Sequence, residues 1–308
     1  MRELSKEFTN DLLAPEGKLH PILERVRKDH TLMLAIRDGY INIYYRGGNI
    51  LRVIDHQGFY QTSFDFQYGL GKSIANSAED VSNQADAQKL VAALPDRKVI
   101  MDEYFAAKGK TEREFQQLVA RENNNSSISN QSEYFVSDIE VTIPRLARFD
   151  ITAIRWLARH RKDGSKCRAA LIEMKYGDGS LEGDAGLLKH LKDMDAFISH
   201  KEQYADLLLT MERQFNQLDE LELLDFNKGI SNAKVKLNPN NRPEVIFILA
   251  NHNPRSSKLK RILSCPEIEK YAQSKLFDLR FYVASFAGYG LHAKCMYTLA
   301  EFRNFCGI

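Results

Sequence analysis

The sequence predicts an α+β protein in which a mixed central sheet is flanked by helices and preceded by a smaller β-rich domain. Residues 167–174 form a nearly unbroken apolar run, which is typical of a central strand covered on both faces. Residues 187–198 and 199–226 repeat apolar side chains at helical spacing. With 308 residues, of which 44% are hydrophobic, the chain has room for two domains.

The N-terminal third reads as a β-meander, with strands predicted at residues 32–37, 40–45, 50–54 and 59–66. Asp38-Gly39 and residues 47–49 supply turns between them. A helical segment near residues 85–94 leads through Pro95, so we predict an N-terminal β-rich domain at residues 1–100 and a second domain at 101–308. The tyrosines and arginines of the meander suit substrate recognition, assembly or plain packing in the sheet, and these alternatives stay open.

Residues 111–119 predict the first helix of the second domain, with Thr111 as N-cap and Glu114 at the capping-box position. The asparagine- and serine-rich residues 123–130 predict a flexible loop after it. Residues 132–143 then alternate as a strand that Pro144 stops. Asp138 and Glu140 lie on that strand, and we expect them to face solvent.

The next two strands are predicted at residues 148–156 and 167–174, joined by a hairpin with Asp163-Gly164 at its turn. The strands would therefore be antiparallel neighbours. Asp150 lies near the start of the first, and Glu173 lies near the end of the second. Antiparallel pairing would bring these two carboxylates together.

Glu173 and Lys175 are two residues apart, so they share one face of the strand. Carboxylates are hard oxygen ligands suited to Mg²⁺ or Mn²⁺, and a nearby lysine can position a water molecule or stabilise a phosphoryl transition state. A bare Glu-x-Lys is a weak signal, because it also occurs at residues 16–18 in a polar stretch. The alternative is an exposed ion pair at the end of a strand.

Asp150 followed by Glu173-Met174-Lys175 resembles the motif of the PD-(D/E)XK, or restriction-endonuclease-like, nuclease superfamily. Its core is a helix, a three-stranded antiparallel meander, a second helix and a further strand. The resemblance implies an Mg²⁺- or Mn²⁺-dependent hydrolase, an endonuclease or exonuclease, in which Asp150, Glu173 and the Met174 carbonyl hold the metal and Lys175 positions water. Phe149 stands where the motif has proline.

The resemblance also implies a metal-associated glutamate on the first helix. Glu112 and Gln116 are four residues apart and share a helix face, so we expect Glu112 to be this acid and Gln116 to support it. Glu114 remains the alternative.

The second core helix would cover residues 187–198, where Lys189 and Lys192 are candidate phosphate contacts. Further strands are predicted at 244–250 and 279–286. The long helical pattern at 199–226 is an insertion that either packs on the core or forms a homodimer surface.

Charge is distributed unevenly along the chain. The formal net charge is only +2, yet residues 145–175 hold nine Lys or Arg against three acids. This local surplus of +6 predicts a nucleic-acid partner, DNA first. The side chains expected to contact phosphates at the hairpin tip are Arg159, Arg161, Lys162 and Lys166.

Four widely spaced cysteines without a CxxC pair disfavour zinc sites and a disulfide framework. No stretch predicts a membrane span or an N-terminal signal, so a cytoplasmic location is expected. The alternative functions are a non-catalytic nucleic-acid-binding or assembly module on the same fold, an RNA-directed nuclease and a metal-dependent phosphatase.

Overall fold

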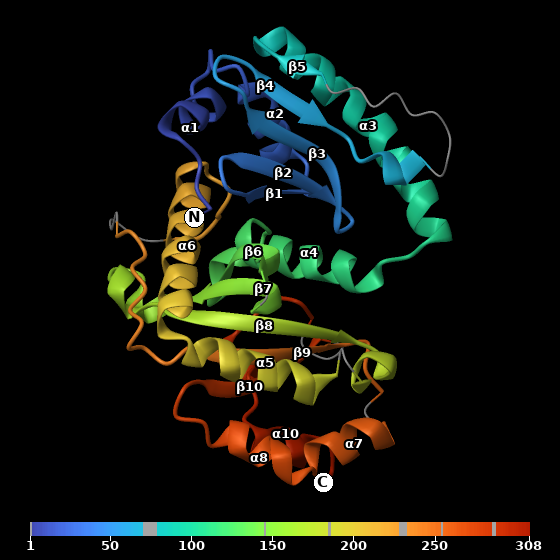
Figure 1. Cartoon of the computed structure of the whole chain (residues 1–308), viewed down its shortest axis with the longest axis vertical. Coiled ribbons are helices and arrows are strands. Elements are labelled where there is room, and N and C mark those ends of the chain that lie inside the picture. The colour runs from blue at the N-terminus through green and yellow to red at the C-terminus, as the bar shows by residue number, and fades with distance from the viewer. Residues whose placement is uncertain are drawn as a thin grey trace. The chain divides into compact units, whose positions relative to one another are not determined.

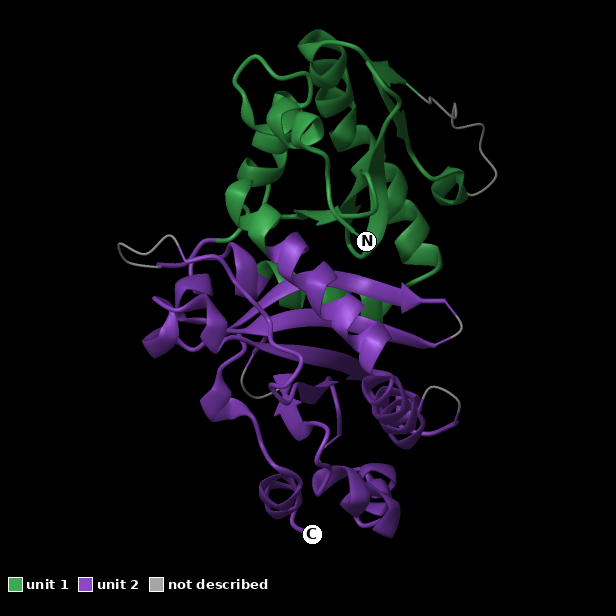
Figure 2. Ribbon diagram, turned by 60° about the vertical axis from the view of Figure 1, so that its left-hand side comes forward, with its two compact units in different colours: residues 1–121, 216–224 green, residues 122–215, 225–308 purple. Residues whose placement is uncertain are grey.

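The chain divides into two compact units, coloured separately in Figure 2. The structure is a computed structural model that describes residues 2–69, 79–144, 146–183, 186–227, 233–253, 255–284 and 288–308. Unit 1 comprises residues 1–121 and 216–224, and unit 2 comprises residues 122–215 and 225–308. The division thus falls beyond residue 120 rather than near residue 100, and unit 1 is built from two separate pieces of chain.

Unit 1 contains the predicted meander, a five-stranded antiparallel sheet in the order β1-β2-β3-β4-β5. Its strands are β1 (Leu32–Ile36), β2 (Tyr40–Tyr45), β3 (Gly48–Asp55), β4 (Tyr60–Ser63) and β5 (Asp80–Val81). The fourth strand is shorter than predicted, because the chain turns into the 3-10 helix η1 (Phe66–Gly69).

The first three helices of unit 1 are α1 (Lys6–Leu13), α2 (His20–Lys28) and α3 (Gln84–Ala107). Helix α3 continues through Pro95 and is longer than the helical segment predicted near residues 85–94 (Figure 1). Proline removes one backbone hydrogen bond from the helix interior. Leu90 and Leu94 before it and Met101 and Tyr104 after it are all buried, so packing holds both halves of α3 in place.

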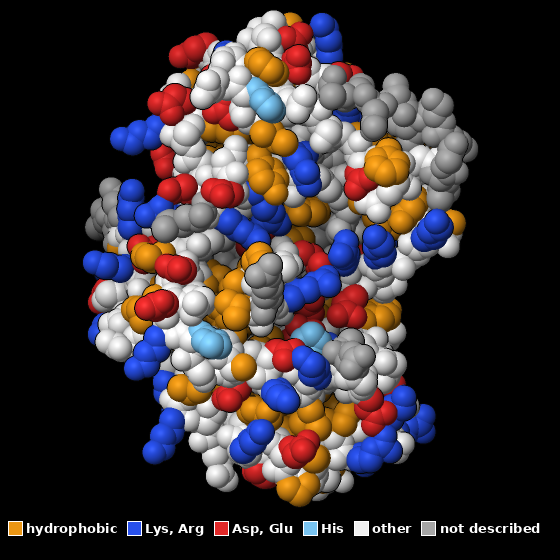
Figure 3. Space-filling view, in the orientation of Figure 1, with side chains coloured by type: hydrophobic (Ala, Val, Ile, Leu, Met, Phe, Trp, Pro, Cys, Tyr) orange, Lys and Arg blue, Asp and Glu red, His pale blue; other side chains and the backbone are white. Residues whose placement is uncertain are grey.

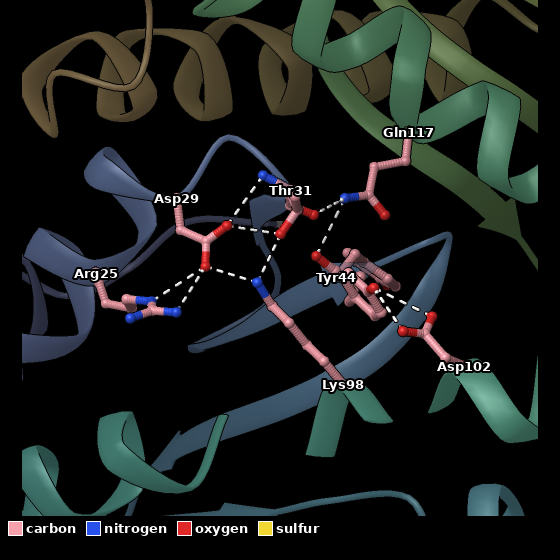
Figure 4. A network of polar contacts seen from close by, with 8 residues as sticks. Arg25, Asp29, Thr31, Tyr44, Lys98, Asp102 and Gln117 are labelled. Atoms are coloured by element: carbon pink, nitrogen blue, oxygen red, sulfur yellow. Dashed lines mark hydrogen bonds and ion pairs between the residues drawn. The ribbon is translucent and has the colours of Figure 1, made fainter. Parts of the chain in front are cut away.

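A polar network joins the helices and strands of unit 1 (Figure 4). The Lys98 ammonium on α3 donates to Asp29 Oδ2 and to Thr31 Oγ1, both at 2.6 Å. The Gln117 amide donates to the carbonyls of Thr31 and Tyr44 at 2.9 and 3.2 Å. Burial alone would raise the pKa of Asp29, but the hydrogen bonds from Lys98 and Thr31 outweigh it and lower the pKa to about 2.

Unit 2 contains the predicted mixed sheet, in the order β10-β9-β8-β7-β6. Strands β6, β7 and β8 form an antiparallel meander, and β9 and β10 add in parallel beyond β8. The strands are β6 (Tyr134–Ile143), β7 (Ala147–Arg155), β8 (Arg168–Tyr176), β9 (Glu244–Ala250) and β10 (Asp278–Val283). Figure 1 shows β8 between β7 and β9, as the apolar run predicted. The strand expected to continue to residue 286 ends at Val283, and residues 285–286 lie outside the described part.

The helices of unit 2 are α5 (Leu187–Ser199), α6 (Lys201–Glu220), α7 (Ser257–Leu263), α8 (Pro266–Ala272) and α10 (Leu299–Phe305), and α6 extends into unit 1. Aromatic contacts pack two of these helices on the sheet: the ring centroid of Phe197 in α5 lies 5.2 Å from that of Phe149 in β7, and the ring centroid of Phe302 in α10 lies 4.9 Å from that of Phe281 in β10. The apolar stripe of α6 is buried within the single chain, as core packing requires. A homodimer stays a prediction.

The asparagine- and serine-rich segment at residues 123–130 begins as helix, and only residues 125–130 form bends, a turn and the start of a 3-10 helix. Helix α4 runs over Thr111–Asn124, and the Asn124 side chain donates to Val136 O and accepts from Val136 N, both at 2.8 Å. Asn123 Oδ1 accepts hydrogen bonds from Ser132 Oγ and Leu291 N. These side-chain amides take the place of backbone hydrogen-bond partners beside β6. The two asparagines therefore hold the end of α4 in place.

The connection between β7 and β8 is longer than a tight hairpin. Residues 156–167 contain two 3-10 turns, η3 (Ala158–His160) and η4 (Gly164–Lys166), instead of a two-residue turn at Asp163-Gly164. Asp163 caps η4 by accepting from Ser165 N at 2.9 Å.

Among the described residues, no helix combines the length and apolar character needed to span a bilayer.

Candidate metal centre

The pairing of β7 with β8 brings Asp150 beside Glu173, as the antiparallel prediction required. Ile151 pairs with Ile172, so the next positions along the two strands are Asp150 and Glu173. The ladder does not continue with backbone bonds there: Asp150 Oδ2 accepts a hydrogen bond from Met174 N at 2.8 Å. One carboxylate oxygen therefore anchors Asp150 to the neighbouring strand.

Glu173 and Lys175 share the face of β8 on which Asp150 approaches. Lys175 Nζ donates to Glu173 Oε1 at 2.7 Å, and the two residues are only 2–3% exposed. A buried ion pair is weak evidence for stability, because removing both charges from water costs several kcal/mol per ion. Because both side chains are buried, the alternative of an exposed ion pair at a strand end is wrong.

Burial raises the pKa of Asp150 above its ordinary value. The hydrogen bond from Met174 N and the charge of Lys175 act in the opposite direction, and Glu140 adds to the increase. Buried carboxylates with a raised pKa beside a lysine are costly to keep in a fold, and such groups concentrate at functional sites.

His190 on α5 is a site residue that the sequence reasoning missed. Its Nε2 lies 3.0 Å from Glu173 Oε1, within ion-pair distance but without hydrogen-bond geometry. Burial, and then the charge of Lys175, lower the pKa of His190 to about 4, so its ring is neutral near pH 7. The helical spacing could have predicted this position, since His190 falls between the buried Leu187 and Leu191 and so lies near the buried face of α5.

The lysines predicted on α5 do not share this inward face. Lys189 and Lys192 are exposed, and Lys189 forms an i,i+4 ion pair with Asp193. Their role as phosphate contacts stays a prediction.

Glu140 and Arg148 add a second ion pair beside Asp150, and neither was predicted to belong to the site. Glu140 adopts a left-handed backbone, with φ at 52°, and pairs with Arg148. Burial would lower the pKa of Arg148, but Glu140, Asp150 and Glu173 together raise it. The expectation that Asp138 faces solvent is also wrong, because its fully buried carboxylate accepts from Gln214 Nε2 at 2.9 Å.

Glu112 and Gln116 lie on α4, in the part of the helix that belongs to unit 1, and their roles stay predictions. Thr111 is not the N-cap: Glu114 N donates to Lys110 O, so Thr111 is already the first helical residue. The alternative helix acid, Glu114, has another partner, since its carboxylate binds Arg46 Nε at 2.9 Å within unit 1.

The prediction that Arg161 contacts nucleic acid is wrong. The side chain is buried, and its guanidinium donates to the carbonyls of Asn130 and Ser132. It also lies over the rings of Phe135 and Phe226, at 5.4 and 5.5 Å from their centroids. Arg161 thus ties the β7–β8 connection to the body of unit 2.

The other hairpin-tip residues, Arg159, Lys162 and Lys166, are exposed but lie away from the carboxylates. Strand β8 runs from Arg168 to Tyr176, and the seven residue steps between Arg168 and Lys175 cover about 23 Å. The sequence predicted that the surplus of positive charge surrounds the carboxylates. In the structure most of this charge lies at the opposite end of the strand.

Comparison with known proteins identifies no relative of this chain. The chain matches no family model, no curated protein and no solved structure.

Proposed function

We propose that the protein is a divalent-metal-dependent nuclease of the restriction-endonuclease-like type that hydrolyses phosphodiester bonds, most directly in DNA. The observation that carries the proposal is the meeting of Asp150, Glu173 and Lys175 on neighbouring strands in a buried setting. The order of elements supports it, because α4, the meander β6–β8, α5 and β9 follow one another as a PD-(D/E)XK core would.

The donor chemistry fits Mg²⁺ or Mn²⁺. Asp150 and Glu173 offer carboxylate oxygens, which hard cations prefer. A strand residue directs its N–H and C=O to the same side, and the N–H of Met174 points to Asp150. The Met174 carbonyl therefore faces the same space and can act as a further ligand. We propose Glu112 of α4 as a further carboxylate ligand, as the resemblance to the nuclease superfamily implies.

A bound cation would supply Lewis-acid stabilisation of the negative charge on a phosphoryl oxygen. The chain's own groups would do the rest. Lys175, held by Glu173, would donate a hydrogen bond to the attacking water or to a phosphate oxygen. The neutral ring of His190 beside Glu173 keeps a nitrogen that can accept a proton. Arg148 would add positive charge from the neighbouring strand.

Cleavage of duplex DNA, single-stranded DNA and RNA in Mn²⁺ tests the proposal. Asp150→Asn and Lys175→Met should each abolish cleavage while leaving the circular dichroism spectrum unchanged. Lys18→Met is the matched control, because Lys18 closes the other Glu-x-Lys and its ammonium donates to Gly58 O. Full cleavage by both site variants would refute the assignment. Binding without any cleavage by the wild type would favour the non-catalytic module, and cleavage of RNA alone would favour the RNA-directed nuclease.

A further inference from the structure

A second polar site lies in unit 2, at the end of β8 away from Glu173 and Lys175. It is a cavity of about 960 Å³ between the β7–β8 connection and residues 236–242. Its volume is in the range of small-molecule binding pockets. Six of the residues that line it are basic: Arg155, Arg159, Lys166, Arg168, Lys236 and Arg242.

Specific contacts build the walls of this cavity. Lys236 N donates to Gly164 O at 3.1 Å, and Arg168 Nε donates to Arg242 O at 2.7 Å. A Cβ placed on Gly164 would lie 1.9 Å from Lys234 O, so only glycine permits this close approach. The segment from 234 to 242 is therefore docked on the β7–β8 connection.

The cations of the cavity outnumber their acidic partners. Asp278 pairs with Arg168 and Arg242, and buried Glu244 lies 3.4 Å from Arg155 Nε and 3.8 Å from Arg168. Asp163, whose pKa is lowered by hydrogen bonds from Ser165 and by the charge of Lys166, is a third carboxylate. Three carboxylates thus face six cations, which leaves a surplus of three positive charges.

Three of these cations have no ion pair among the residues that the structure describes: Arg159, Lys166 and Lys236. On the face shown in Figure 3, basic and acidic side chains are intermixed, and the whole chain carries a formal net charge of only +2. The surplus at the cavity is therefore local. The carboxylate-bound arginines give the cavity a fixed framework, and the three unpaired cations remain available to an anion.

We propose that this cavity binds the phosphate groups of a nucleotide, either in a nucleic-acid strand or as a free nucleotide. Arginine and lysine supply charge-assisted donors to phosphate oxygens, while Leu157 and Leu237 in the lining offer apolar surface to a base. The site is distinct from the proposed metal centre, which lies about 23 Å along β8. In the nucleic-acid case the inference deepens the proposed nuclease function by giving it a second contact with its substrate.

The test compares binding by the wild type and by the triple variant Arg159→Ala/Lys166→Ala/Lys236→Ala. The probes are a fluorescein-labelled single strand of about 12 nucleotides, followed by anisotropy, and AMP and inorganic phosphate, followed by calorimetry. EDTA is present throughout, so failure of the metal centre cannot change the result. The matched control Lys6→Ala/Lys89→Ala/Lys108→Ala removes the same charge from exposed positions of unit 1.

Loss of three phosphate contacts should weaken strand binding about a hundredfold near 0.1 M salt and reduce the slope of log K against log salt by about 2. That result identifies nucleic acid as the source of the phosphate. Loss of AMP or phosphate binding, with strand binding unchanged, supports the cavity and identifies a free nucleotide. If every probe binds the triple variant and the control alike, or if no probe binds the wild type, the proposal is overturned.

Discussion

Asp150→Asn should change the stability of the protein in opposite directions with and without a divalent cation. In the metal-free protein, burial raises the pKa of Asp150, so folding disfavours its ionised form. A raised acid pKa helps folding only below the unfolded value of about 3.9, and this contribution is lost as pH rises through the folded pKa. Asparagine keeps an oxygen that accepts from Met174 N and removes the charge, so the metal-free variant should be the more stable protein near pH 7.

The magnitude follows from linkage. Without metal, the gain should be on the order of 1 kcal/mol, the usual size of a point-substitution effect. With free metal at about 100 times its Kd, binding to the folded state alone adds about 2.7 kcal/mol to the wild type. For a unit of the size of unit 2, each kcal/mol of added stability raises Tm by about 2–4 °C. Metal binding should therefore raise the wild-type Tm by about 5–10 °C. In Asp150→Asn this increase should nearly vanish.

Differential scanning calorimetry in EDTA and in Mn²⁺, from about pH 5 to pH 8, measures both effects. Asp163→Asn serves as the control, because Asp163 is an exposed aspartate that caps η4 in the same unit. The control should retain the full metal-induced increase in Tm. Two results would refute the reasoning: an equal metal-induced increase in Asp150→Asn, or a lower metal-free Tm for that variant near pH 7.

Three further substitutions test contacts within the two units. Arg161→Met should lower the free energy of unfolding by about 2–4 kcal/mol in urea denaturation, because the buried carbonyl of Ser132 and the carbonyl of Asn130 lose their donor; an unchanged value would contradict a structural role. Lys98→Met removes a donor that keeps the pKa of Asp29 at about 2, so its deficit of about 1 kcal/mol near pH 7 should disappear as pH falls from about 4 to 2; a pH-independent deficit would count against the ion pair. Gly164→Ala should lower stability by about 2 kcal/mol or more in the same assay, because its Cβ would overlap Lys234 O; full stability would show that the loop can move aside.

Local patterns predicted the strands well because each strand carries its own signal. The apolar run of β8 and the alternation of β6 place both within two residues of where the structure has them. The approach of Asp150 to Glu173 followed from antiparallel pairing alone, without knowledge of the longer connection. What the sequence could establish was therefore which strands are antiparallel neighbours in the chain.

Features that depend on distant residues were not predictable in this way. Arg161 reads as a surface cation until Phe226, which lies far along the chain, is seen beneath it. Glu114 likewise meets Arg46 only after unit 1 has folded. The distance between the hairpin tip and the carboxylates was accessible, however: two antiparallel strands with acids at their outer ends must place the connecting segment at the other end.

Unit 1 does not correspond to a single uninterrupted fragment of the chain. Leu4 exchanges two hydrogen bonds of 3.0 Å with the Gln217 side chain, and the Arg27 guanidinium donates to Leu221 O. A truncation that ends at residue 121 removes both partners, and one that starts at residue 122 leaves a nine-residue stretch without the body it packs on. Attempts to separate the meander from the sheet of unit 2 should therefore give poorly folded products, unless a peptide covering 216–224 is supplied or the chain is circularly permuted to join the pieces.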